Sequence, residues 1–281
     1  MRRRPQRRSL RAGTATELSV GHATLLGLLH GPAELLPISS SGHVALLPWL
    51  ARWPEANADP GLRKSLEVAL HAGTAAALLL SLRGEVRTAA SELDARRVSV
   101  LALSLLPPAF VGTRFGGAIE RRLGTPATIA VGLIVGSAAM AAADVRSNGR
   151  RDHRQATATD GLALGLAQAA ALMPGISRGG ATLAVARARG FGRLDAHLLS
   201  RDVALPVIVG ATALKLVDLR SAGIDARTGW AMGSGAAAAF VSTLASTRVI
   251  AAVQRSRSLL PYALYRSALA AIVLARLRRE R

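Results

Sequence analysis

Cysteine is absent from this sequence of 281 residues, and aromatic residues make up only 3% of it. Without cysteine the chain has no disulfide framework, no zinc site with thiolate ligands and no thiol nucleophile. Charged residues are also sparse, at 19%. A soluble domain of this length normally has more charge and a larger aromatic core, so these absences argue against a water-soluble enzyme.

Acidic residues are scarcer than basic ones: the chain has 17 aspartates and glutamates and 36 lysines and arginines. Its formal net charge is therefore +19. Two kinds of partner could account for this excess: anionic lipid headgroups or nucleic acid. No basic surface rich in aromatic residues accompanies the charge, as nucleic-acid binding would favour. We therefore expect the lipid bilayer as a partner, and no nucleic acid.

Long apolar runs dominate instead, with 50% hydrophobic residues and a mean hydropathy of +0.30. Runs long enough to cross a bilayer as helices lie at 65–82, 98–115, 126–145, 198–219, 229–253 and 258–276. Shorter runs form two pairs that contain proline or glycine: 20–37 with 40–51, and 160–174 with 179–191. The sequence predicts an all-α polytopic membrane protein with six transmembrane helices and two re-entrant helical hairpins.

Residues 1–17 are rich in arginine and precede the first apolar run. They could be the n-region of a signal peptide, but the run that follows contains Glu34 and shows no clear cleavage site. We interpret them as a basic N-terminal arm at the membrane face.

The two interrupted pairs resemble each other at a constant offset of 138 residues, close to half the chain. Identical residues at this offset are Gly27 and Gly165, Ile38 and Ile176, Ser39 and Ser177, and Gly42 and Gly180. Each half then holds one pair and three spans, and because three is odd, the second half must enter the membrane inverted. The sequence therefore predicts one integral membrane domain built from inverted repeats at 18–145 and 160–281, with a connecting loop at 146–159.

The first pair places His30, Glu34 and His43 inside an apolar run. Ionisable groups are costly in lipid and are tolerated where they line a cavity within the protein. Glu34 could bind a divalent cation or act as a base, and His43 could move a proton or attack phosphorus. This stretch therefore predicts a site for a small polar ligand.

The second pair supplies positive charge to match an anionic ligand. Arg178 offers a planar guanidinium that can bind two phosphate oxygens. Gly179 and Gly180 beside it allow backbone N–H groups to face an anion at a helix start. Serine hydroxyls in both turns could donate to phosphate, and one of them could be the nucleophile. These serines are Ser39, Ser40, Ser41 and Ser177.

Each of these residues also has a structural interpretation. Serines in membrane segments often satisfy backbone groups or link helices. Glu34 and Arg178 could form a structural ion pair, although ionisable groups inside a membrane are functional by default. His43 could be a hydrogen-bonded structural residue.

Two further groups of polar residues lie outside the turns. Glu67, His71 and Thr74 fall on one face of a predicted helix, at i, i+4 and i+7. We expect them to orient the groups that touch the ligand, with a polar seam between helices as the alternative. Arg266, early in the last span, could hold a lipid phosphate, but snorkelling to the headgroups is the favoured interpretation.

The two turns carry the motifs Glu34-Leu-Leu-Pro-Ile-Ser-Ser-Ser-Gly-His43 and Pro174-Gly-Ile-Ser-Arg-Gly-Gly-Ala-Thr182. These resemble the two signature motifs of the bacterial undecaprenyl-diphosphatase family, the bacitracin-resistance type. Further similarity lies at 68–74, 210–214 and 261–266, so the resemblance runs from about residue 18 to the end.

The resemblance implies a multi-pass hydrolase of the bacterial plasma membrane. Its reaction would convert undecaprenyl diphosphate to undecaprenyl phosphate and phosphate, which recycles the lipid carrier for peptidoglycan synthesis. The resemblance also implies a divalent cation, Mg²⁺ or Ca²⁺. The chain could pair as a homodimer.

From the residue chemistry and the resemblance together we predict the members of the site. The predicted catalytic residues are Glu34, His43, Ser40, Ser177 and Arg178. The predicted phosphate-binding residues are Ser39, Ser41, Arg178, Gly179 and Gly180. The residues predicted to lie behind them are His30, Glu67 and His71. Glu34 is the predicted metal ligand, joined by His30 if that side chain faces the site.

Two positions depart from the family motifs. His30 stands where the family has its first Glu, and Gly179 stands where the family has Ser. The glycine keeps the backbone N–H donor. A neutral imidazole at position 30 could coordinate a cation but prefers transition metals to Mg²⁺ or Ca²⁺. In the alternative interpretation, His30 only packs behind Glu34.

A different class of function remains open at this point. Inverted repeats with interrupted helices are also typical of transporters. The chain could therefore bind or flip a polyprenyl phosphate without hydrolysing it. Loss of the first Glu slightly favours this alternative, whereas Glu34, His43, Ser177 and Arg178 favour hydrolysis.

Overall fold

Polar caps and proline set the start of several helices. Asp59 accepts hydrogen bonds from two backbone N–H groups at the start of the helix that begins at Pro60. Thr125 forms a capping box before the helix that begins at Pro126. Proline suits the first helical position because its missing N–H would have no partner there.

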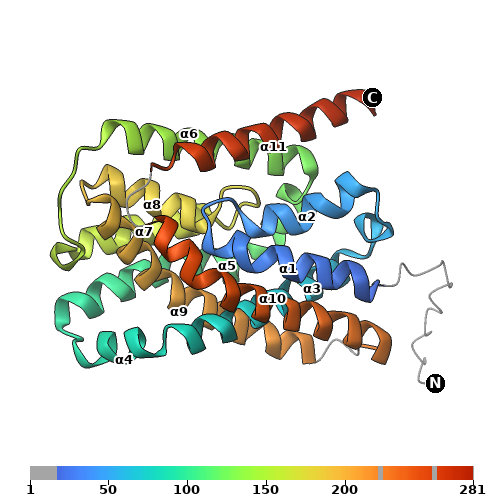
Figure 1. The fold of residues 1–281 in the computed structure, drawn as a ribbon, viewed down its shortest axis with the longest axis horizontal. Helices are drawn as coiled ribbons and strands as arrows, with labels where there is room; N and C mark the ends of the chain where they lie inside the picture. The colour runs from blue at the N-terminus through green and yellow to red at the C-terminus, as the bar shows by residue number, and fades with distance from the viewer. Residues whose placement is uncertain (1–17, 221–223, 255–257, 281) are drawn as a thin grey trace, which may run out of the picture.

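The computed structural model describes residues 18–220, 224–254 and 258–280, and the regular secondary structure of these residues is helical (Figure 1). The predicted arm at 1–17 lies outside the described residues. The first half contains α1 (Val20–Leu35), α2 (Ser40–Ala51), η1 (Pro54–Asn57), α3 (Pro60–Ser81), α4 (Arg83–Ser91), α5 (Ala95–Leu123) and α6 (Pro126–Arg146). The second half contains η2 (His153–Gln155), α7 (Ala158–Ala170), α8 (Arg178–Ala188), α9 (Arg193–Arg220), α10 (Ala226–Gln254) and α11 (Leu260–Arg279).

The sequence does not predict α4. This helix has nine residues and a polar composition, and its described side chains are exposed. A search for apolar runs of membrane-spanning length misses such a helix because it buries no apolar face. The ten apolar segments of the sequence correspond to the other ten α-helices.

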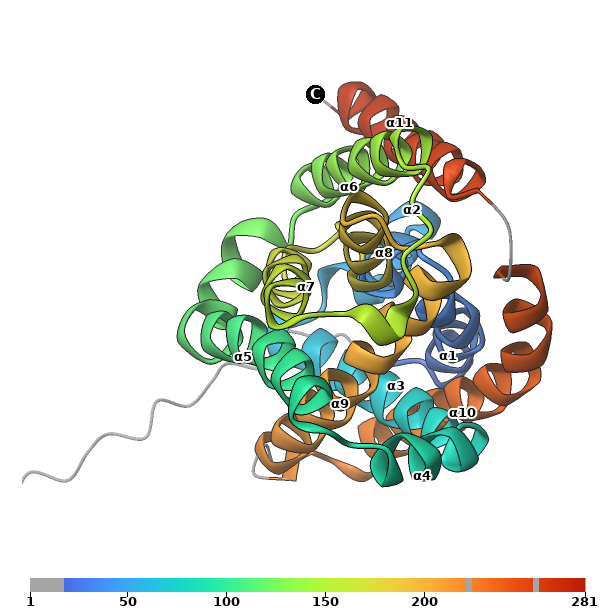
Figure 2. The same cartoon turned by 90° about the vertical axis from the view of Figure 1, so that its left-hand side faces the viewer.

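The two interrupted pairs, α1–α2 and α7–α8, lie at the centre of the molecule, and the longer helices surround them (Figure 2). α1 packs along α10 of the other half, and α7 packs along α5 of the first half. α5 and α10 hold equivalent places in the predicted repeat. Each interrupted pair therefore packs along a long helix of the other half.

The directions of α6 and α11, which also hold equivalent places, agree with an inverted repeat. Asp144 near the end of α6 accepts a hydrogen bond of 2.9 Å from the backbone N–H of Leu259 at the start of α11. Ile129 near the start of α6 belongs to the same apolar cluster as Val273 late in α11. The two helices therefore run antiparallel, and the inverted repeat itself stays a prediction.

Glycines allow the backbones of the central helices to approach closely. A Cβ at Gly27 of α1 would overlap the carbonyl oxygen of Gly235 in α10, and a Cβ at the repeat-related Gly165 of α7 would overlap that of Leu103 in α5. A Cβ at Gly73 of α3 would overlap the carbonyl oxygen of Ala236. Small residues at helix contacts are the usual means of close packing in membranes, where lipid supplies no hydrophobic drive for helix association.

We expect Gly73→Ala to destabilise the fold by about 1–3 kcal/mol, because the added methyl group meets backbone that cannot rotate away. The thermal unfolding midpoint of the detergent-solubilised protein measures this effect. Gly210→Ala in α9 is the matched control, since a Cβ there meets nothing within 4 Å. An equal midpoint for both variants would contradict the close contact of α3 with α10.

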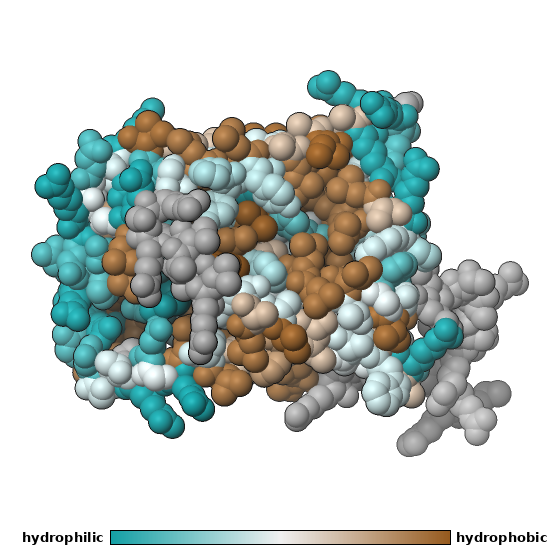
Figure 3. Space-filling view, in the orientation of Figure 1, coloured by the Kyte–Doolittle hydropathy of each residue, from teal (hydrophilic) through white to brown (hydrophobic). Residues whose placement is uncertain are grey.

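The face shown in Figure 3 has a largely apolar middle between two hydrophilic ends. Leu106, Phe110, Trp230 and Leu264 are each more than 60% exposed. Among the described helices, α5, α6, α9 and α11 are long and apolar enough to cross a membrane. The chain is thus an all-α membrane protein, and the count of six spans stays a prediction.

Candidate functional site

The turns of the two central pairs share an unusual backbone conformation. Ser39 precedes α2 with a φ of 76°, and Ser177 precedes α8 with a φ of 68°. Non-glycine residues seldom adopt positive φ because Cβ then crowds the backbone. Each serine oxygen accepts a hydrogen bond from the N–H three residues on, at Gly42 and Gly180 respectively. Strained backbone of this kind clusters at functional turns.

The two turns meet at an ion pair between α1 and α8. Arg178 Nη2 lies 2.7 Å from Glu34 Oε1, and the side chains are 19% and 8% exposed. The Ser40 hydroxyl donates to the other carboxylate oxygen, Glu34 Oε2. The structure therefore brings together three of the predicted catalytic residues. The ion pair of the structural interpretation is also present.

Two helix N-termini face this ion pair, because Ser40 opens α2 and Arg178 opens α8. Helix geometry leaves the first backbone N–H groups without intrahelical partners, and the aligned peptide dipoles add partial positive charge. α2 and α8 have 12 and 11 residues, enough for an appreciable dipole. The arrangement suits an anion such as phosphate.

The other predicted phosphate-binding residues differ in what they offer. Gly179 lies in open surroundings, since a Cβ there would meet only the Cα of Pro37, at 4.0 Å. Ser41 is half-buried beside Ser40. Gly180 has another role, because its N–H donates to Ser177 and its missing side chain leaves room for Met140 and Arg266. Phosphate binding by these residues stays a prediction.

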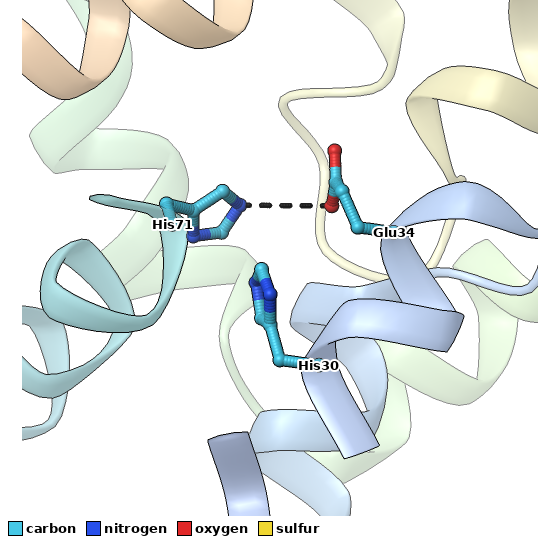
Figure 4. A group of neighbouring side chains, drawn as sticks. All are labelled: His30, Glu34 and His71. Carbon is cyan, nitrogen blue, oxygen red and sulfur yellow. Dashed lines mark ion pairs between the residues drawn. The ribbon is translucent and has the colours of Figure 1, made fainter. Parts of the chain in front are cut away.

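A cluster of two imidazoles and one carboxylate lies beside the ion pair (Figure 4). His30 and Glu34 come from α1 and His71 comes from α3, and one ligand atom of each lies within 4.8 Å of the others. His71 Nε2 is 3.8 Å from Glu34 Oε2, and the two imidazole rings meet edge to face at 4.4 Å. The sequence predicts that both histidines lie behind the reacting groups, with His30 as a metal ligand if it faces the site. In the structure both imidazole rings lie beside Glu34.

Neighbouring oxygens hold the Nδ1 atoms of both histidines. His71 Nδ1 donates to the backbone oxygen of Glu67 at 2.9 Å, and His30 Nδ1 lies 2.9 Å from Thr74 Oγ1. Glu67 thus orients His71 through its backbone oxygen. The Glu67 carboxylate instead accepts a hydrogen bond of 2.6 Å from Lys64 Nζ. The predicted polar face of α3 is turned toward α1.

The three side chains of this cluster fit a divalent cation. His30 is fully buried, and its Nε2 has no hydrogen-bond partner in the described part of the chain. Buried polar atoms are normally satisfied, so a bound cation would account for this nitrogen. An imidazole that donates its other N–H to a backbone carbonyl, as His71 does, is also the usual orientation of a metal ligand.

His43 lies on the other side of Ser39, in contact with α11. Its Nδ1 donates to the Ser39 carbonyl oxygen at 2.7 Å. Its Nε2 must then carry the lone pair, which accepts a hydrogen bond of 2.6 Å from the Tyr265 hydroxyl. The sequence gives Tyr265 no role in the site, although it lies in the similar stretch at 261–266. The tautomer leaves Nε2 as the atom that could take a proton or attack phosphorus.

The favoured sequence interpretation of Arg266 is wrong. Its side chain does not snorkel to the headgroups but is fully buried. Its Nη2 donates to the carbonyl oxygens of Gly175 and Ile176 at 2.8 and 2.9 Å. Its Nη1 lies 3.4 Å from the carbonyl oxygen of Pro37. Arg266 thus joins the two turns from behind. The sequence gives no sign of this burial because arginine usually keeps its charge in water.

Comparison with known proteins places this site in a wider context. The family model described as bacitracin resistance protein BacA matches residues 23–272.

Curated relatives cover nearly the whole chain. A protein of Pelobacter propionicus named undecaprenyl-diphosphatase is 36% identical over 258 residues, which cover 87% of this chain and 92% of the relative. Proteins of the same name from Geobacter sulfurreducens and Moorella thermoacetica are each 33% identical, over 92% of this chain and 98% of their own length.

Proposed function

This chain belongs to the bacitracin resistance protein BacA family, and we propose from that membership that it hydrolyses undecaprenyl diphosphate to undecaprenyl phosphate and phosphate. It is an enzyme of the undecaprenyl-diphosphatase type. The names of the curated relatives do not favour the alternative of a binder or flippase without hydrolysis.

The observation that carries the proposal is the meeting of Glu34 and Arg178 between the N-termini of α2 and α8. A diphosphate brings several negative charges into an apolar environment, so its site needs fixed positive charge and hydrogen-bond donors. Arg178, the helix N-termini and the serine hydroxyls supply both. The Glu34 carboxylate, beside Arg178 and Ser40, can accept a proton.

Each predicted catalytic residue then has a step in the reaction. Arg178, with Ser177 and Gly179, holds the terminal phosphate and neutralises its charge. Glu34 holds the Ser40 hydroxyl and accepts a proton as that hydroxyl, or a water in its place, attacks the terminal phosphorus. The anhydride P–O bond breaks, and undecaprenyl phosphate leaves. Attack by water releases phosphate directly, whereas attack by Ser40 forms a phosphoserine ester that a water then hydrolyses to phosphate and free Ser40. His43 Nε2 is the second group able to move a proton.

Glu34, His30 and His71 would hold a divalent cation. When bound, the cation would add positive charge beside the diphosphate oxygens.

The setting follows from the substrate. The long polyprenyl chain stays among lipid tails, and the diphosphate reaches the site between the helices. We place the enzyme in the bacterial plasma membrane, where the product re-enters peptidoglycan synthesis and the reaction confers resistance to bacitracin. The homodimer stays a prediction.

Phosphate release by the purified protein tests the proposal. With undecaprenyl diphosphate in detergent or lipid nanodiscs, we expect phosphate and undecaprenyl phosphate in equal amounts. Undecaprenyl phosphate offered as the substrate should release no phosphate, because it contains no anhydride bond. Saturable binding of the diphosphate without release of phosphate would refute the proposed hydrolysis and support the transport alternative.

A further inference from the structure

We propose that His30, Glu34 and His71 form a site for a first-row transition metal ion that favours nitrogen ligands, such as Zn²⁺ or Co²⁺, in preference to Mg²⁺ or Ca²⁺. The inference rests on the proposed function for the purpose of the site. The binding itself follows from the three side chains and can be measured without any substrate.

The ring nitrogens of the cluster present lone pairs to the carboxylate. In the neutral tautomer that donates Nδ1–H to the backbone oxygen of Glu67, His71 Nε2 carries a lone pair that faces Glu34 Oε2 at 3.8 Å. This distance is too long for a hydrogen bond. The two atoms then repel unless a cation lies between them, whereas a protonated His71 would form an ion pair with Glu34 instead.

His30 completes the set with a second nitrogen. Its Nδ1 can donate to Thr74 Oγ1, which leaves the lone pair on the unpartnered Nε2. The whole side chain is buried, so water does not reach this atom from the surface. Two nitrogens and one carboxylate oxygen thus converge from α1 and α3 (Figure 4), and among the described residues His30 Nε2 has no hydrogen-bond partner.

The donor set decides which class of ion is bound. Mg²⁺ and Ca²⁺ prefer oxygen ligands, whereas imidazole suits Zn²⁺ and its neighbours in the first row. Two histidines with one glutamate also make a common three-ligand set for zinc, with one position left open. Ligands of a tetrahedral zinc ion lie about 3.4 Å apart, so small side-chain movements would close the present separations.

Metal binding to the purified, chelator-treated chain tests this inference. We expect about one Co²⁺ or Zn²⁺ per chain by elemental analysis after dialysis, and a Co²⁺ absorption spectrum typical of nitrogen ligands. Binding should be at least about tenfold tighter than for Mg²⁺ or Ca²⁺. Loss of an outer-shell partner alone typically costs about 10–100-fold in affinity, so His30→Gln should cost at least about tenfold. His30→Glu should shift the preference toward Mg²⁺ and Ca²⁺.

The control for these variants is His153→Gln. Asp152, His153 and Asp195, beside η2 and early in α9, form another His and carboxylate cluster among the described residues. His153→Gln should leave the Co²⁺ spectrum unchanged. If a His30 variant fails to fold, as judged by its metal-free unfolding midpoint, His71→Gln tests the same ligand set from a half-buried position.

Three results would overturn the inference: no Co²⁺ spectrum, equal affinity for Mg²⁺ and Zn²⁺, or binding that depends on His153 instead of His30. A protonated His71 in place of a metal would give the first of these. None of them would affect the proposed hydrolysis, since phosphate release can persist with another ion. Conversely, a metal-loaded protein that releases no phosphate would refute the hydrolysis and leave the metal site standing.

Discussion

Arg178→Ala is expected to lower the rate of phosphate release by roughly 10³-fold, and Arg178→Lys by roughly ten- to hundredfold. Loss of a cationic group that stabilises phosphoryl transfer typically has an effect of this size or larger. Lysine keeps the charge but loses the planar fork that can bind two phosphate oxygens at once. Steady-state kinetics with undecaprenyl diphosphate measure both variants.

The structure adds a second reason for the large effect of Arg178→Ala. Removal of the guanidinium leaves the Glu34 carboxylate, 8% exposed, without its partner at 2.7 Å. A buried charge without a partner is costly and alters the position of its neighbours. The effect should therefore fall mainly on kcat, because Glu34 also holds Ser40.

Arg189→Lys is the matched control for the lysine variant. Arg189 Nε binds Asp160 Oδ1 at 2.7 Å, the same kind of ion pair, but it lies at the end of α8 opposite to Arg178. We expect its turnover to stay within about twofold of wild type, since lysine keeps the charge and Arg151 also binds Asp160, at 2.8 Å. If Arg178→Lys retained wild-type turnover as well, Arg178 would not bind the reacting phosphate.

The sequence predicts much of the site because the turns carry their own local signals. Proline and glycine interrupt the apolar runs, and the constant offset matches Ser39 with Ser177, whose backbone proves equally unusual. Paired interrupted helices in inverted repeats predict a shared site near the midplane, where the two turns come together. The contact between Glu34 and Arg178 agrees with this expectation across 144 residues of sequence.

The remaining parts of the site depend on contacts that no local pattern encodes. The pairing of His43 with Tyr265 spans 222 residues, and only the fold brings the two together. The spacing of the polar residues in α3 predicts a polar face but not which helix packs against that face. The sequence therefore does not predict that His71 lies beside Glu34 of α1. α4 escapes prediction for a different reason, since it is short and polar and contributes no apolar run.

Arg266 shows most clearly why composition misleads in a membrane chain. Arginine near the end of a span normally extends to the headgroups, and its stem covers apolar surface. Here Gly136 and Gly180 leave a space that the guanidinium fills, because a Cβ at either glycine would collide with it. Burial then becomes favourable because carbonyl oxygens from both turns accept its N–H groups.

Arg266→Leu is therefore expected to destabilise the fold by about 2–6 kcal/mol and to lower phosphate release at least about 100-fold. The stability estimate follows from two well-placed carbonyl oxygens, of Gly175 and Ile176, that would each lose a donor in a buried setting. The rate falls because Gly175 and Ile176 directly precede Ser177 and Arg178, so the turn that holds phosphate would shift. Thermal unfolding in detergent and steady-state kinetics measure the two effects.

A positioning role can be separated from a merely structural one by the pattern of variants. Arg266→Lys should recover part of the unfolding midpoint, since one ammonium can still reach a carbonyl, yet it should raise KM and lower kcat because it cannot hold both turns. Arg276→Leu on the same helix is the control. Arg276 donates to the Leu50 carbonyl at 2.7 Å, away from the turns, so its loss should lower stability by about 1 kcal/mol and leave kcat unchanged. A fully active Arg266→Leu enzyme would show that the two turns hold their positions without this guanidinium.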